Sequence, residues 1–161
     1  MVRSAVFAAL IGLCAWISIP TAPIAFTLQT FGVFLALGVL GGKWGSLSIL
    51  IYLLLGAVGA PVFSGFQGGP GVLLGATGGY IWGFLGAGLV YWCFEKLCKP
   101  LGFLLGILCC YLCGSLWYSI YAGTAGFGAS LAQCVLPYLI PDGVKLTLAY
   151  TLSKRLRKYM K

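Results

Sequence analysis

The chain has 161 residues, of which 61% are hydrophobic and 7% are charged. No soluble domain of this length carries so large an apolar fraction without aggregating, so we predict an all-α integral membrane protein. Ten Lys and Arg against two Asp and Glu give a net charge of +8. These basic residues are scattered between apolar runs or gathered at the C-terminus, which argues against binding of nucleic acid and predicts contact with anionic membrane lipid.

Six apolar segments with tight loops between them predict one compact bundle of six transmembrane helices, a single domain over residues 1–161. The predicted spans are about 4–19, 27–40, 46–57, 78–95, 101–122 and 141–157. Pro20 ends the first span and Pro141 opens the last. With Arg3 before it, the first segment also resembles a signal peptide, which is the alternative interpretation of that stretch.

The basic residues fall on one side of this bundle. They occupy the termini and the second and fourth loops, namely Arg3, Lys43, Lys96, Lys99 and the five basic residues from Lys154 onward. By the positive-inside rule these parts and both termini are cytoplasmic. The other three loops contain no Lys or Arg, so Lys145 is the single basic residue that this topology leaves in the outer half of the membrane.

Glycine and other small residues predict close helix packing. Ala5 and Ala9 form a small-residue pair on the first helix. Longer ridges at four-residue spacing follow on the fourth and fifth helices: Gly75, Gly79, Gly83 and Ala87, then Gly102, Gly106, Cys110 and Gly114. The segment 60–79 is uncharged and interrupted by two prolines, so we predict that it forms a lid or a pocket wall.

Asp142 and Lys145 stand three positions apart, so both side chains leave the same face of a helix. An ionisable residue inside a span is a candidate functional residue by default. A helix-capping role accounts for Asp142 but not for Lys145, which faces the positive end of the helix dipole. The pair therefore binds a ligand from outside or forms a structural ion pair.

Catalysis is not predicted. The chain has no His, and its two carboxylates, Asp142 and Glu95, fall on opposite sides of the predicted membrane. Lys43 is followed by Trp44 rather than Ser or Thr, so the turn is not a phosphate-binding loop. The seven cysteines lack metal-site spacing and are interpreted as packing residues. We therefore expect no enzyme, no catalytic residue, no metal site and no cofactor, but a binding or transport protein.

Four motifs in order, at 27–30, 53–63, 71–80 and 136–145, resemble the successive motifs of the BioY family. The resemblance implies a biotin-binding substrate (S) subunit of an energy-coupling factor (ECF) transporter. It implies high-affinity binding of biotin from outside and its uptake across the bacterial cytoplasmic membrane. It also implies three partner chains, a transmembrane coupling protein and two ATPases. The sequence departs from the family pattern at Ala76, Gly143 and Val144, which affects the expected pocket shape rather than the substrate class.

The same resemblance implies that Asp142 and Lys145 bind the substrate and that Ala5 and Ala9 meet the coupling protein. Asp142 can accept a hydrogen bond from a ureido N–H of biotin, while Lys145 can donate to the ureido oxygen or to the carboxylate, and both possibilities stay open here. Further substrate-binding candidates are Thr27, Gln29, Gln67, Phe63, Phe66, Tyr80, Trp82, Gly75 and Gly79. The aromatic residues among them are equally compatible with lipid-facing or packing positions.

Three other functions stay open at this point. The first is an S subunit for another vitamin, such as thiamine or riboflavin. The second is a solitary biotin facilitator that works without ATPases. The third is a structural membrane subunit in which Asp142 and Lys145 form an internal tether.

Overall fold

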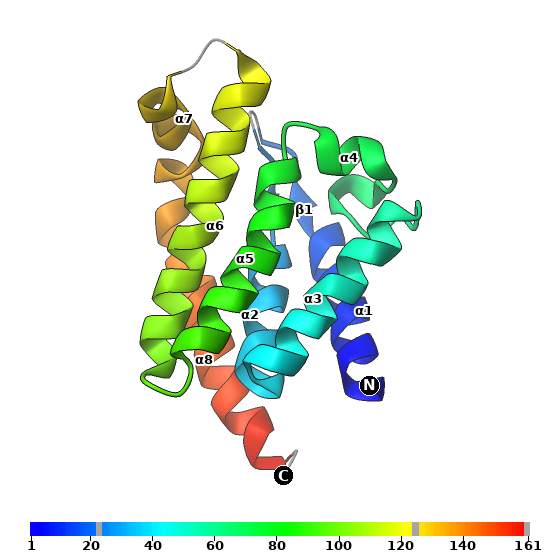
Figure 1. Ribbon diagram of the computed structural model, residues 1–161, viewed down its shortest axis with the longest axis vertical. Helices are drawn as coiled ribbons and strands as arrows, with labels where there is room; N and C mark the ends of the chain where they lie inside the picture. Colours follow the sequence, from blue (N-terminus) through cyan, green and yellow to red (C-terminus); the bar gives the residue numbers. More distant parts are fainter. Residues whose placement is uncertain (22–23, 124–125, 160–161) are drawn as a thin grey trace.

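The computed structural model describes residues 1–21, 24–123 and 126–159, and it consists mainly of helices that run roughly along one axis (Figure 1). The helices are α1 (Val2–Trp16), α2 (Gln29–Leu40), α3 (Gly42–Ala57), α4 (Pro70–Leu74), α5 (Gly78–Phe94), α6 (Lys99–Ala122), α7 (Phe127–Cys134) and α8 (Leu139–Tyr159). Two short 3-10 turns, η1 (Ser64–Phe66) and η2 (Leu136–Tyr138), and a ribbon of two strands, β1 (Ser18–Ile19) and β2 (Phe26–Thr27), complete it.

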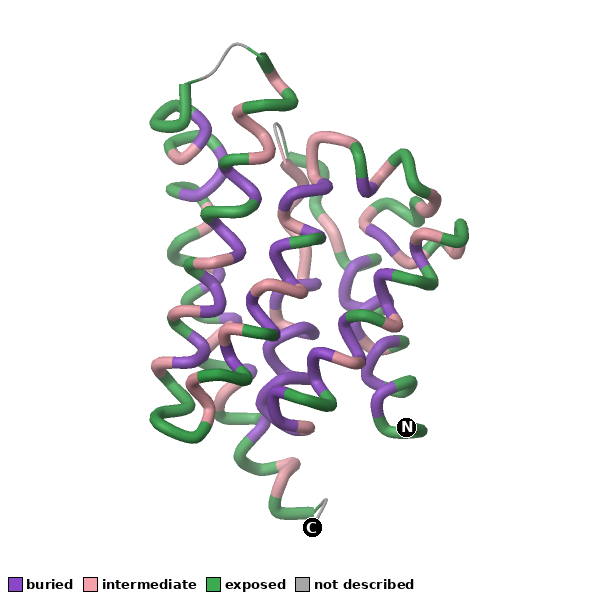
Figure 2. Tube along the Cα trace, in the orientation of Figure 1, coloured by how far each residue is buried: buried purple, intermediate pink, exposed green. Residues whose placement is uncertain are grey.

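The core is organised around α2. Figure 2 shows α2 buried along nearly its whole length, and ten of its residues, from Gln29 to Val39, are buried. Helices α1, α3 and α8 pack directly against it. An apolar helix that is buried on every side needs no polar face, which explains why the segment 29–40 has no amphipathic pattern.

Helices occupy all six segments that we predicted as spans, but several of the predicted ends are wrong. The first helix ends at Trp16 rather than at residue 19, because Ser18 and Ile19 form β1 and pair antiparallel with Thr27 and Phe26 of β2. For the same reason the second helix begins at Gln29 and not at Thr27. The hydroxyl of Thr27 accepts a hydrogen bond from the backbone N–H of Gln29 at 3.3 Å, at the start of α2.

The third helix begins at Gly42, four residues earlier than predicted, and the turn before it is reduced to Gly41. Gly41 has a φ of +82°, a left-handed conformation that glycine adopts without strain. The N–H of Gly42 has no partner within the helix, and the carboxylate of Glu95 accepts its hydrogen bond at 2.8 Å. A carboxylate at a helix N-terminus is also favoured by the helix dipole, so Glu95 stabilises this early start.

The last helix begins at Leu139, so the prediction that Pro141 opens it is corrected. Pro141 lies in the first turn, where a residue without an N–H costs no helical hydrogen bond. The connection before it contains α7 and η2, and Gly123, with a φ of +65°, ends α6 in the left-handed conformation that is typical after a helix. The predicted lid segment 60–79 contains η1 and α4.

The two predicted glycine ridges do pack α5 against α6. A Cβ built on Gly83 would lie 3.1 Å from the Cα of Cys110, which belongs to the second ridge. Similarly, a Cβ on Gly114 would overlap the ring of Tyr80 on α5. Small residues thus let the two backbones approach closely, as the spacing predicted.

Within the described residues, α6 is the one helix both long enough, at 24 residues, and apolar enough to cross a membrane by length and composition. Helices α1, α2 and α3 are apolar but shorter. The outer face of α6 carries four leucines at four-residue spacing, each about half exposed: Leu104, Leu108, Leu112 and Leu116. A continuous exposed apolar stripe of this kind is typical of a surface that faces lipid or another protein.

Candidate functional site

A cavity of about 300 Å³ lies between the β ribbon, η1 and the adjoining parts of α2, α5, α6 and α8. Its inner wall is formed by buried side chains, among them Gln29, Phe63, Tyr111, Asp142 and Lys145. At its outer end the lining residues Pro20, Gly65 and Gln67 are exposed. The cavity therefore has a buried polar end and a mouth that opens to the surroundings.

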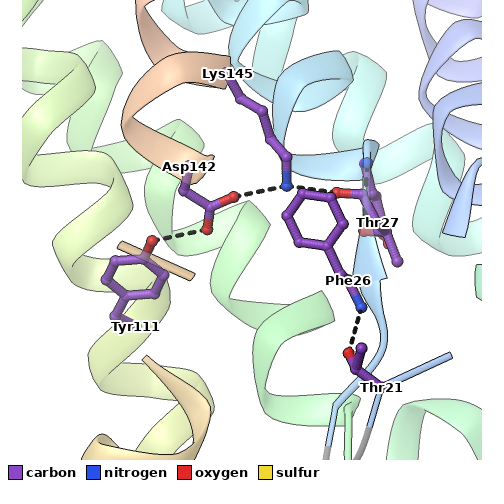
Figure 3. A network of polar contacts seen from close by, with 7 residues as sticks. Thr21, Phe26, Thr27, Tyr111, Asp142 and Lys145 are labelled. Carbon is purple, nitrogen blue, oxygen red and sulfur yellow. Dashed lines mark hydrogen bonds and ion pairs between the residues drawn. The ribbon is translucent and has the colours of Figure 1, made fainter. Parts of the chain in front are cut away.

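The polar end is built on one turn of α8. Lys145 Nζ lies 2.8 Å from Asp142 Oδ1, and both side chains are less than a tenth exposed. The other carboxylate oxygen of Asp142 accepts a hydrogen bond from the hydroxyl of Tyr111 on α6 at 2.7 Å, as Figure 3 shows. Both oxygens of Asp142 are thus satisfied, as a buried carboxylate requires.

Lys145 has two further contacts, both to β2. Its ammonium donates a hydrogen bond to the carbonyl oxygen of Thr27 at 2.7 Å and lies 3.7 Å from the ring centroid of Phe26 (Figure 3). Attraction between a cation and an aromatic face is strengthened by burial. The backbone of Phe26 is in turn held by Thr21, whose hydroxyl accepts the N–H of Phe26 at 3.2 Å. The ribbon between α1 and α2 thereby positions the cation.

A second polar side chain lines the cavity from α2. The amide nitrogen of Gln29 donates a hydrogen bond to the hydroxyl of Tyr52 at 2.7 Å. Tyr52 packs edge-on against Phe63, with ring centroids 5.5 Å apart. Since its amide nitrogen is bound to Tyr52, Gln29 keeps its carbonyl oxygen as an acceptor.

Seven of the eleven predicted substrate-binding residues line this cavity: Thr27, Gln29, Phe63, Gln67, Tyr80, Asp142 and Lys145. They come from segments far apart in the chain, so the fold brings them together. Two lining residues of the polar end, Tyr111 and Phe26, were missed by the sequence reasoning. Tyr111 lies 31 residues before Asp142 on another helix, and no local pattern indicates that its hydroxyl reaches that carboxylate.

Of the other four candidates, Gly75, Gly79 and Trp82 do not line the cavity. Gly79 packs beneath Trp117, and the carbonyl oxygen of Gly75 accepts a hydrogen bond from the indole N–H of Trp117 at 2.9 Å. Trp82 lies two positions after Tyr80 on α5, which turns it to the other side of the helix, and its side chain is exposed. Phe66 is also outside the lining and stacks on Trp16 instead.

Ala5 and Ala9 are exposed on one face of α1, away from the cavity. Larger apolar residues of the same helix, Val2, Val6 and Leu13, are exposed as well. Small residues on an exposed helix face let a second helix approach closely.

Among the residues that the structure describes, no three His, Cys, Asp or Glu side chains are grouped so that they could hold a metal ion. The cavity instead offers a carboxylate, an ammonium and a tyrosine hydroxyl at one end of largely apolar walls. Such an arrangement suits a mostly apolar, neutral ring that carries both N–H donors and a carbonyl acceptor.

Comparison with known proteins gives a consistent result. The model of the BioY family matches residues 1–161. The probable biotin transporter BioY of Pyrococcus horikoshii is 43% identical to this chain, over 95% of this chain and 93% of that protein. The biotin transporter BioY of Thermotoga maritima is 38% identical, over 98% of this chain and 95% of that protein.

A solved structure is similar as well. The crystal structure of the S-component for biotin from an ECF-type ABC transporter matches with a TM-score of 0.89 and 29% sequence identity. The match covers 98% of this chain and 89% of that chain.

Proposed function

The chain belongs to the BioY family, and on that basis we propose that it is the biotin-binding S subunit of an ECF transporter and takes part in high-affinity biotin uptake. The observation that carries the proposal is the cavity with its buried polar end of Asp142, Lys145 and Tyr111. Its volume of about 300 Å³ falls at the lower end of the range for small-molecule pockets. The function needs no catalytic residue and no cofactor, because biotin is the transported ligand.

The ureido ring of biotin complements this polar end. Its N–H groups are donors for the carboxylate of Asp142, and its carbonyl oxygen is an acceptor for the ammonium of Lys145. The apolar ring and chain of biotin then lie along Phe63, Tyr80 and the other apolar lining residues. A ring compound that lacks N–H donors gains none of these hydrogen bonds with Asp142, so the polar end favours the ureido ring over it.

We place the chain in the cytoplasmic membrane as a multi-pass protein with six spans, α1, α2, α3, α5, α6 and α8. The exposed leucine stripe of α6 supports a lipid-facing surface. Helix α2 has only 12 residues, and the strand before it, β2, extends the segment. Pairing of β2 with β1 satisfies the backbone hydrogen-bonding groups of this non-helical stretch at membrane depth. Both termini and the α2–α3 and α5–α6 turns lie toward one end (Figure 1), and their Lys and Arg residues favour a cytoplasmic position for that end.

Equilibrium binding of labelled biotin to the purified protein tests the proposed function. We expect tight, saturable binding and a biotin-dependent rise in the melting temperature, because a ligand that binds only the folded state stabilises it. Trp82→Leu is the control variant, since Trp82 is exposed and outside the cavity, and we expect it to bind like the parent. Stabilisation by thiamine or riboflavin instead would assign another vitamin, and no saturable binding of any of them would favour a purely structural subunit.

We further propose that the α1 face with Ala5 and Ala9 docks on a transmembrane coupling protein that carries two ATPases. Ala9→Leu should reduce co-purification with those partners at least about fivefold, because the added bulk overpacks a close helix contact. Biotin binding by the isolated subunit should not change. Ala129→Leu on α7, an exposed alanine elsewhere, is the matched control. Partner binding and uptake that are unaffected by Ala9→Leu would contradict this docking face and favour a facilitator that works alone.

A further inference from the structure

Among the described residues that line the cavity, Lys145 is the one cationic side chain. The other Lys and Arg residues that the structure describes are Arg3 near the N-terminus, Lys43 at the start of α3, Lys96 and Lys99 at the α5–α6 turn and the start of α6, and those in the last turns of α8. The nearest of them on the same helix, Lys154, is nine positions beyond Lys145, about 14 Å away at the rise of an α-helix. A ligand carboxylate in this cavity therefore has one possible cationic partner.

That cation is already fully engaged. The ammonium of Lys145 has three N–H donors, and its surroundings provide Asp142 Oδ1 at 2.8 Å, the carbonyl oxygen of Thr27 at 2.7 Å and the ring of Phe26 at 3.7 Å (Figure 3). Any ligand acceptor, the ureido oxygen or a carboxylate, has to share or displace one of these contacts, so the charge of the group decides which of the two can lie here. Displacing the Thr27 carbonyl would leave a backbone acceptor without its partner in the cavity wall.

Charge balance points the same way. Asp142 and Lys145 form a buried pair with no net charge. A second carboxylate beside Lys145 would place two anions against one cation at a buried site, and an uncompensated buried charge is strongly unfavourable. The neutral ureido ring adds donors and an acceptor without adding charge. The ring therefore occupies the polar end, and the carboxylate lies at the other end of the ligand.

The mouth of the cavity has only neutral polar side chains among its described residues. Ser64 and Gln67 line it beside the exposed Gly65 and Pro20. A hydroxyl or an amide N–H donates equally well to an oxygen of a carboxylate and to the carbonyl oxygen of an amide. Solvent also reaches this end, so a carboxylate there keeps part of its hydration and gains no ion pair.

We propose that this pocket recognises the neutral bicyclic head of its ligand and does not discriminate between a charged carboxylate and a neutral amide at the other end. Biotin and its neutral amides then bind with about equal affinity. The inference rests on the proposed biotin-binding function and specifies which part of the ligand determines selectivity.

Competition against labelled biotin by unlabelled biotin and by its primary amide tests this inference in the purified chain. The primary amide has nearly the shape of the acid but no charge, so a difference in affinity reports recognition of charge. We expect the two Kd values to agree within about threefold. If Lys145 binds the carboxylate, the amide should instead bind about 10- to 150-fold more weakly, the loss of one charge-assisted hydrogen bond, and the inference is wrong.

A head-modified analogue completes the design. Biotin methylated on a ureido nitrogen has lost one donor and should bind at least about tenfold more weakly, because the methyl group blocks a hydrogen bond at the polar end. Undiminished binding of this analogue would place the head elsewhere and overturn the inference. The outcomes separate the two proposals: a folded parent that does not bind biotin refutes the proposed function, whereas a parent that binds biotin but rejects its amide refutes only the inference.

Discussion

Asp142→Asn should abolish high-affinity biotin binding and also make the empty protein less stable. The substitution removes the anion that accepts hydrogen bonds from Lys145 and Tyr111 and, in the proposed complex, from the ureido N–H groups. Loss of one member of a buried hydrogen-bonded charge pair costs about 2–5 kcal/mol of binding free energy, so we expect Kd to rise about 30-fold or more.

The stability effect has a separate cause. Without Asp142, the buried side chain of Lys145 has only the Thr27 carbonyl and the Phe26 ring as partners. Leaving one charge of a buried pair without its partner costs about 3–5 kcal/mol. A lower melting temperature of the ligand-free variant in detergent would measure this cost.

A double variant, Asp142→Asn with Lys145→Gln, separates binding from folding. It removes both charges, so the buried site stays neutral and the melting temperature should return toward that of the parent. Biotin binding should remain absent, because neither the anion nor the cation is restored. If either Asp142→Asn or the double variant binds labelled biotin with the affinity of the parent, the polar end of the cavity is not the biotin site.

The polar pair could be predicted from the sequence because its evidence is local. Three-residue spacing on a helix decides that Asp142 and Lys145 share a face, and their charge makes them exceptional in an apolar chain. The rest of the polar end depends on tertiary structure. Tyr111 reaches Asp142 from α6, and Phe26 reaches Lys145 because a short ribbon replaces the expected helix ends.

The helix ends were wrong for the same physical reason. The early start of α3 depends on the carboxylate of Glu95, which lies 53 residues later in the chain and caps the N–H of Gly42. No window of neighbouring residues contains that interaction. A long apolar run therefore predicts that a helix exists, while hydrogen bonds to distant residues decide where the helix begins.

Glycines within a recognisable motif have a role that the sequence alone leaves undecided. Gly75 and Gly79 belong to the motif at 71–80 together with Tyr80, which does line the cavity. The sequence does not separate a residue that lines a pocket from one that lets a neighbouring helix approach. The structure gives Gly79 the second role, because the α5–α6 contact lies directly over it.

Gly79→Ala should therefore destabilise the protein rather than alter the cavity lining directly. A Cβ at this position would overlap the Cβ of Trp117 and lie 2.9 Å from the carbonyl oxygen of Cys113, both on α6. Neither atom is the free end of a flexible side chain, so the helices must move apart. Overpacking of this kind costs about 1–3 kcal/mol, although alanine favours a helix more than glycine does.

Gly143→Ala is the matched control for this prediction. Gly143 is also in a helix, α8, but a Cβ there would meet no atom within 4 Å, so the helix propensity of alanine acts alone. We expect a higher melting temperature for Gly143→Ala and a lower one for Gly79→Ala in the same detergent. Similar stabilisation by both substitutions would contradict close packing at Gly79, because the two variants differ in the space that the neighbouring helix leaves for a methyl group.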